Sequence, residues 1–78
     1  MRTTLSGFDY RRARIAAGLE LTEVARAVGY GEAMMSRVER SERRLPLERE
    51  RKLRAFLASA LRRKAEEANG LIHTLATA

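Results

Sequence analysis

Arginine dominates the chemistry available to this chain. Of its 78 residues, 16 are Lys or Arg and ten are Asp or Glu, and the formal net charge is +6. The guanidinium group carries five N–H donors in a planar fork that matches phosphate oxygens and the edge of guanine. The charge is concentrated, because residues 37–64 carry a net +7, residues 1–36 only +1 and residues 65–78 a net −2. This concentration predicts a polyanionic partner, most often nucleic acid, over the alternative of a solvated Arg-rich helix.

Residues suited to catalysis or metal binding are scarce. The chain has no Cys and a single His, His73, so we expect no disulfide, no thiolate nucleophile and no zinc site. The carboxylates alternate with basic residues at helical spacing, as in residues 48–52, which favours solvated ion pairs over a paired acid and base. We therefore predict no enzymatic activity, no catalytic residues and no cofactor or metal.

The composition is typical of one small folded domain. Hydrophobic residues make up 45% of the chain, enough for a small core in 8.8 kDa. No apolar run approaches the roughly 18–20 residues needed to cross a membrane. The first residues lack the apolar stretch of a secretion signal. These features predict a cytoplasmic protein without a membrane contact.

The elements that must position the charges are predicted to be helices. Ala, Arg, Leu and Glu are frequent, and no stretch alternates with the period of a strand. Asp9 is the predicted N-cap of the first helix, and Asn69 with Gly70 is predicted to end the last one. Residues 41–46 would form a short helix or a turn. The predicted helices cover residues 9–17, 20–28, 31–40 and 47–68.

Residues 18–39 carry the most informative pattern. Two short helices flank residues 28–31, and the small Ala25 would let the second helix cross closely over the first. The first helix would brace the second, which projects polar side chains outward, as in a helix-turn-helix. The predicted apolar seam between them is Val24, Val28, Met35 and Val38.

The longer string of residues around this pattern resembles the lambda-repressor-like family of helix-turn-helix DNA-binding domains (Cro/cI-type, XRE family). The resemblance spans about residues 8–61. It implies an all-α fold of five helices, here with a long C-terminal helix, and divides the chain into a DNA-binding domain over residues 1–68 and a tail over residues 69–78. It rests on Arg14, Gly18, Leu19, Glu23, Val24, Ala25, Val28, Gly29, Met35, Ser36, Val38, Glu39, Arg43 and Pro46.

The resemblance also implies roles for individual residues. Arg14 and Glu39 would form an ion pair that orients the third helix, and Ser41 stands where a glycine usually ends that helix. The third helix would lie in the major groove of DNA, with phosphate contacts at its start and in the loop after it. The implied base-reading face is Glu32, Ala33, Met34, Ser36 and Arg37, and the implied phosphate contacts are Gly31, Arg40, Arg43 and Arg44.

The predicted function is sequence-specific binding of double-stranded DNA by a small regulator, of the phage or mobile-element repressor type. One recognition helix reads only about four or five base pairs, so we expect a homodimer, at least on DNA, and a palindromic operator with half-sites about 34–36 Å apart. An antitoxin or another protein-interaction module on the same scaffold, with a toxin or other protein as partner, is the alternative. The tail could instead fold back onto the core. The candidate dimer contacts are Leu57, Leu61, Leu71, Ile72 and Leu75.

Overall fold

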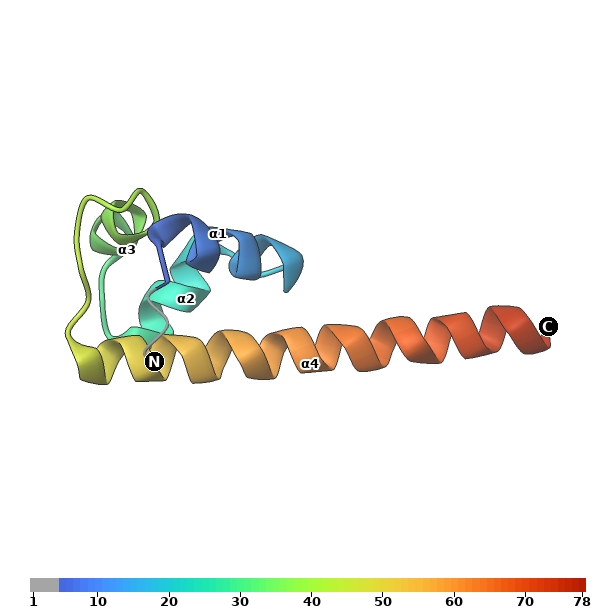
Figure 1. The fold of residues 1–78 in the computed structure, drawn as a ribbon. Helices are drawn as coiled ribbons and strands as arrows, with labels where there is room; N and C mark the ends of the chain where they lie inside the picture. The colour runs from blue at the N-terminus through green and yellow to red at the C-terminus, as the bar shows by residue number, and fades with distance from the viewer. Residues whose placement is uncertain (1–4) are drawn as a thin grey trace.

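The computed structural model describes residues 5–78 of the chain. This part contains four α-helices joined by loops, and no strand. The predicted all-α class is confirmed. Residues 41–46 form a turn and extended backbone, so the prediction of five helices was wrong for the described part of the chain. The helices are α1 (Gly7–Ala16), α2 (Leu21–Val28), α3 (Glu32–Glu39) and α4 (Leu47–Thr77), drawn in Figure 1.

Helix α1 begins two residues before its predicted start, because the cap is Ser6 rather than Asp9. The Ser6 hydroxyl accepts a hydrogen bond from the Asp9 amide at 3.3 Å, and the Asp9 carboxylate accepts one from the Ser6 amide at 2.9 Å. This reciprocal arrangement is a capping box, with Asp9 as its third helical residue. The hydrogen bonds from Ser6 lower the pKa of Asp9 below its usual value. Helix α1 ends at Ala16, one residue before its predicted end, and Gly18 follows in the left-handed conformation (φ 71°) expected of the residue that stops the helix.

Helix α4 is longer than predicted and does not stop at Asn69 and Gly70. It runs for 31 residues to Thr77, so residues 69–77 are its last turns rather than a separate tail. Glycine inside a helix costs only about 1 kcal/mol relative to alanine, and no proline follows Pro46 to break the helix. The stop signal was therefore weak compared with the helix-forming residues on both sides of it.

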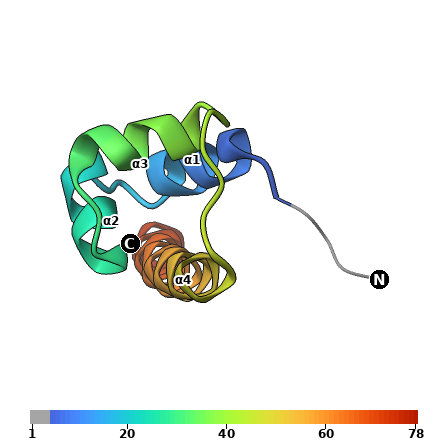
Figure 2. The ribbon, with the colours of Figure 1, turned by 90° about the vertical axis from the view of Figure 1, so that its left-hand side faces the viewer.

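The three short helices gather over the first half of α4 and form the core with it. Figure 2, a view along α4, shows the three short helices together on one side of it. The predicted seam between α2 and α3 is confirmed, since all four of its side chains are buried. From α4, Leu53 and Leu57 complete this core. The cluster consists of Tyr10, Val24, Ala25, Val28, Met35, Val38, Leu53 and Leu57.

Two polar contacts fix α4 against the other helices. The Tyr10 hydroxyl donates a hydrogen bond to the Glu50 carboxylate at 2.9 Å, which ties α1 to α4, and burial raises the pKa of Tyr10. The Arg49 guanidinium lies 4.5 Å from the centre of the Tyr30 ring and donates to the backbone carbonyl of Val28 at the end of α2. A cation over an aromatic ring adds to the stability of such a contact.

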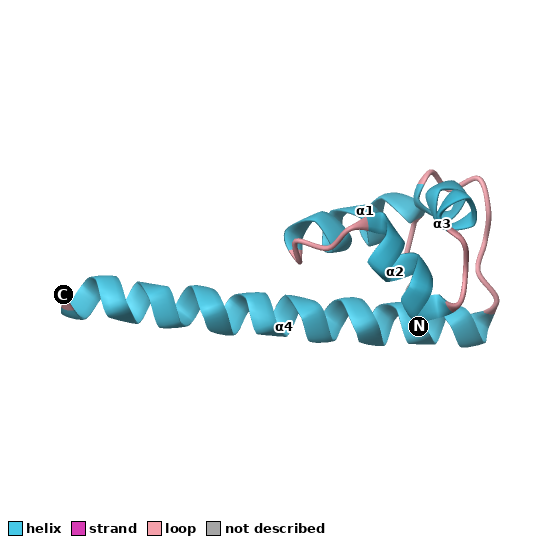
Figure 3. Cartoon of the chain, turned by 180° about the vertical axis from the view of Figure 1, so that it is seen from behind, coloured by secondary structure: helices cyan, strands magenta, loops and turns pink. Residues whose placement is uncertain are grey.

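Beyond Ala60, α4 leaves the rest of the protein. We call residues 7–60 the body and residues 61–77 the arm. Figures 1 and 3 show the arm without a neighbouring helix, and every residue from 62 onward is exposed. The radius of gyration, 14.5 Å, exceeds the roughly 11.5 Å of a compact chain of this length. The arm therefore accounts for the elongated shape.

Candidate nucleic-acid interface

Helices α2 and α3 meet through a tight turn. Gly29 ends α2 in the left-handed conformation (φ 76°), and the Tyr30 amide donates to the Ala25 carbonyl at 2.9 Å. Ala25 is 2% exposed, as expected for a small residue where two helices cross. Gly31 then caps α3 without a side-chain hydrogen bond. Helices α2 and α3 are thus two short helices that a tight turn joins and that pack directly against each other.

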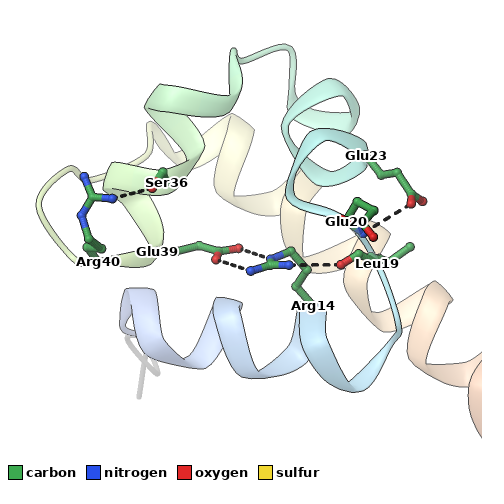
Figure 4. A network of polar contacts seen from close by, with 7 residues as sticks. All are labelled: Arg14, Leu19, Glu20, Glu23, Ser36, Glu39 and Arg40. Atoms are coloured by element: carbon green, nitrogen blue, oxygen red, sulfur yellow. Dashed lines mark hydrogen bonds and ion pairs between the residues drawn. The ribbon is translucent and has the colours of Figure 1, made fainter.

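The inner face of α3 is fixed by the core and by one ion pair. Met35 and Val38 are buried, and the last residue of the helix, Glu39, is only 4% exposed. The Arg14 guanidinium donates to both Glu39 carboxylate oxygens, at 2.8 and 3.1 Å, and to the Leu19 carbonyl at 3.1 Å (Figure 4). The structure thus places the two residues of the implied pair in contact. The hydrogen bonds with Glu39 raise the pKa of Arg14 above its usual value.

The outer face of α3 is open to solvent. Glu32, Ala33 and Arg37 are exposed, whereas Met34 and Ser36 are half-buried. Within residues 5–78, Arg37 has no side-chain hydrogen bond or ion pair, so its guanidinium is available to a ligand. The Glu32 carboxylate instead accepts a hydrogen bond from the Thr22 hydroxyl at 3.3 Å. The five implied base-reading residues therefore divide into three that project outward and two that lie against the body.

Three arginines follow α3, and they differ in whether their guanidinium groups already have partners in the protein. Arg40 donates to Ser36 and forms an ion pair with Glu42, so the body already satisfies its guanidinium. Arg43 and Arg44 are exposed. In the part of the chain that is described, neither makes a side-chain hydrogen bond or ion pair. Of the three arginines among the implied phosphate contacts, these two are the ones whose guanidinium groups the described structure leaves available, and Gly31 is exposed at the start of α3.

The loop that carries these arginines leaves α3 at Ser41. This residue takes the left-handed conformation (φ 61°), which glycine adopts at lower cost than a residue with a Cβ. The Ser41 amide donates to the Val38 carbonyl at 3.0 Å and the Glu42 amide to the Arg37 carbonyl at 2.9 Å. These two bonds close the helix end as a Schellman motif. They fix the direction in which Arg43 and Arg44 leave the helix.

The candidate dimer residues separate into a buried and an exposed group. Leu57 is 4% exposed and belongs to the core of the single chain, and Leu61 is half-buried at the end of the body. Leu71, Ile72 and Leu75 are 64%, 62% and 78% exposed on the arm. The alternative in which these residues fold back onto the core is not the arrangement found. Sequence patterning could not separate the two groups, because both fit the apolar spacing of one helix.

Among residues 5–78, no group of three or more His, Cys, Asp or Glu side chains is close enough to hold a metal ion. In the same range, no helix combines the length and the apolar character needed to cross a membrane.

Comparisons with known proteins give neither a family nor a function for this chain. No family model, no curated protein and no solved structure matches the chain. Function is therefore inferred from the side chains and geometry of the chain itself.

Proposed function

We propose that this chain is a sequence-specific double-stranded DNA-binding protein of the helix-turn-helix type, with α3 as the helix that enters the major groove. The observation that carries the proposal is the asymmetry of α3. Its inner face is held by the core and by Arg14, and its outer face presents the unpaired guanidinium of Arg37. A recognition helix needs this combination, because bases can be read only by side chains whose backbone is fixed.

The side chains of α3 suit a division of roles on the base edges. Arg37 can donate two hydrogen bonds to O6 and N7 of a guanine, and Glu32 can accept from the amino group of a cytosine. Ala33 and Met34 offer apolar contact for a thymine methyl group. Reading by Glu32 requires that it exchange its hydrogen bond with Thr22 for one with the base.

The basic loop after α3 suits the DNA backbone. Arg43 and Arg44 leave the helix at a fixed end and have no partner within residues 5–78. Phosphate contacts set the position of a protein on the duplex and make the affinity depend on salt. The net +7 of residues 37–64 would add a long-range attraction to the duplex.

A chain that binds one DNA sequence can act as a regulator by occupying its operator. We therefore infer a small cytoplasmic repressor of the type resembled by the sequence, whose bound form blocks access of other proteins to the same DNA.

Selection of bound duplexes from a random DNA pool tests the proposal. The full-length protein is expected to enrich one motif, and an Arg37→Ala variant is expected to lose the preference at one base pair of each half-site. Arg51→Ala is the matched control, because it removes the same charge from an exposed position on α4, away from both α3 and the arm. A pool without an enriched motif, at a salt concentration where the protein still binds DNA, would reject sequence-specific recognition.

A second candidate function is protein interaction, as in an antitoxin. The exposed apolar residues of the arm favour it, since a surface of this kind usually marks a contact site. A toxin encoded next to this gene should then co-purify with the full chain and be lost with an Ile72→Glu variant, whatever the outcome of the DNA selection.

A further inference from the structure

The arm carries an apolar stripe that the body does not use. Leu61, Ala65, Ala68, Ile72 and Leu75 follow one another at intervals of four, three, four and three residues. This is the spacing that keeps side chains on one face of a helix over several turns, and it is the repeat of a coiled coil. Except for the half-buried Leu61, all of these residues are exposed.

The arm is a poor helix by itself. Only its first turn meets the body, where Leu61 is half-buried and the Lys64 side chain approaches Gly18. Every residue from Ala65 onward is exposed, and Asn69 and Gly70 in this part both lower helix stability. Isolated helices of about this length are marginal in water, and most helices are stabilised by packing of an apolar face. A helix that extends through Asn69 and Gly70 is therefore best explained by a partner that covers the stripe.

We propose that the partner is a second copy of this chain, and that the two arms pair antiparallel with Ala68 at the centre. In that register Leu61 lies level with Leu75 of the second copy, and Ala65 lies within one residue of the level of Ile72, a difference of about 1.5 Å along the axis. The two Ala68 residues meet at the centre, where small side chains allow the helices to approach closely. Small Ala65 thus lies beside large Ile72, a combination that helps to fill a helical interface without voids. A parallel pair would instead place small Ala65 and Ala68 opposite their own copies.

Charge favours the same orientation. Arg62, Arg63 and Lys64 lie at the start of the arm, and the last turn of α4 contains no basic residue. The C-terminal end of a helix carries partial negative charge, which cations stabilise. Antiparallel arms bring the three basic residues of one copy to the end of the other. Parallel arms would place six basic residues at one level.

Sedimentation of the full-length protein without DNA tests the pairing, which does not depend on DNA binding. The wild-type chain is expected to be dimeric at micromolar concentration. Ile72→Glu places a charge on the stripe and is expected to raise the dimer Kd by roughly tenfold or more, which corresponds to about 1.4 kcal/mol or more. Thr74→Glu is the matched control, because it adds the same charge to the arm away from the stripe. A wild-type protein that sediments as a monomer, or equal effects of both variants, would overturn the proposal.

Cysteine crosslinking tests the orientation, and the absence of native cysteine makes the experiment clean. A mixture of Ala65→Cys and Ile72→Cys chains is expected to form mixed disulfides under mild oxidation, and Ala68→Cys is expected to crosslink to itself. Ile72→Cys alone should not crosslink, because antiparallel arms would separate the two positions by about eight residues, or roughly 12 Å along the axis. A disulfide needs Cα atoms about 4.4–6.8 Å apart. Efficient self-crosslinking at residue 72 without mixed disulfides would overturn the antiparallel arrangement.

Discussion

Gly7 and Ser41, 34 positions apart in the sequence, are joined by a 2.9 Å hydrogen bond from the Gly7 amide to the Ser41 hydroxyl. The bond links the first residue of α1 to the turn that ends α3. It satisfies an amide that α1 itself leaves without a carbonyl partner. Ser41 thus holds a left-handed backbone conformation and also fastens the start of the chain's first helix to the end of its third.

The close approach at Gly7 predicts that alanine is not tolerated there. A Cβ on Gly7 would lie 2.2 Å from the Val38 carbonyl oxygen and 2.7 Å from the Ser41 amide nitrogen, both backbone atoms that move only with the helix. We expect Gly7→Ala to lower the free energy of unfolding by about 1–3 kcal/mol, as overpacked substitutions do. Chemical denaturation followed by circular dichroism measures it. Unchanged or increased stability would show that α1 and α3 are farther apart than this.

At Gly70 the same substitution by alanine is expected to raise stability rather than lower it. Gly70 lies inside α4 with no atom within 4 Å of the position that a Cβ would take. Gly70→Ala is expected to stabilise the arm by up to about 1 kcal/mol, because alanine is the better helix former. Helical ellipticity and hydrogen exchange of residues 61–77 report the change. Loss of helicity in this variant would mean that the glycine is needed for a contact or a bend in the arm.

Removal of Arg14 is expected to damage the fold without any direct contact to a ligand. Arg14→Ala leaves the Glu39 carboxylate buried without its cation, which costs up to about 3–5 kcal/mol. Denaturant titration gives the loss. Replacing both residues by leucine should recover part of it, because an apolar pair removes the uncompensated charge. If Arg14→Ala is as stable as the wild type, the pair does not hold α3.

Arg37 is expected to contribute to base preference. Arg37→Ala should cost about 1–3 kcal/mol on the preferred duplex and little on unrelated sequences, since a bidentate contact with guanine would be lost. Fluorescence anisotropy with the preferred and a scrambled duplex at one salt concentration measures both affinities. An equal loss on both duplexes would identify Arg37 as a phosphate contact only.

Arg43 and Arg44 are expected to act through the backbone of the duplex. Arg43→Ala and Arg44→Ala should each weaken binding about equally across sequences. Each should also lower the slope of log K against log salt by roughly one unit. Binding titrations at several salt concentrations give the slope. A slope that stays at the wild-type value in both variants would place the loop away from DNA.

Short-range signals predicted most of the body. Gly18 and Gly29 end their helices because only a residue without a Cβ takes a left-handed conformation at little cost, and this preference is visible in the sequence. The seam of α2 and α3 follows from apolar spacing alone. The Arg14–Glu39 contact could be anticipated only through the family resemblance, since no rule of spacing joins positions 25 residues apart.

The predictions that failed concern features that small, competing free energies or the packing of distant residues decide. Asn69 and Gly70 are typical helix ends, yet each costs a helix about 1 kcal/mol or less, so the residues around them decide. Leu57 and Leu61 are four residues apart on α4, but only the position of the other helices makes one core and the other its border. The Arg49–Tyr30 contact was likewise not predicted, because it joins two elements whose relative position the sequence does not reveal.

The continuity of α4 has a geometric consequence. No proline or turn separates the body from the arm, so whatever holds the arm also fixes the direction in which α3 points. Each residue of a helix turns the chain by about 100° and advances it by about 1.5 Å. One residue inserted after Ala60 would thus rotate α3 to a different side of the arm, whereas seven would move it about 10 Å while almost restoring its orientation. The number of residues in α4 therefore sets the angle, about the helix axis, between α3 and the apolar stripe of the arm.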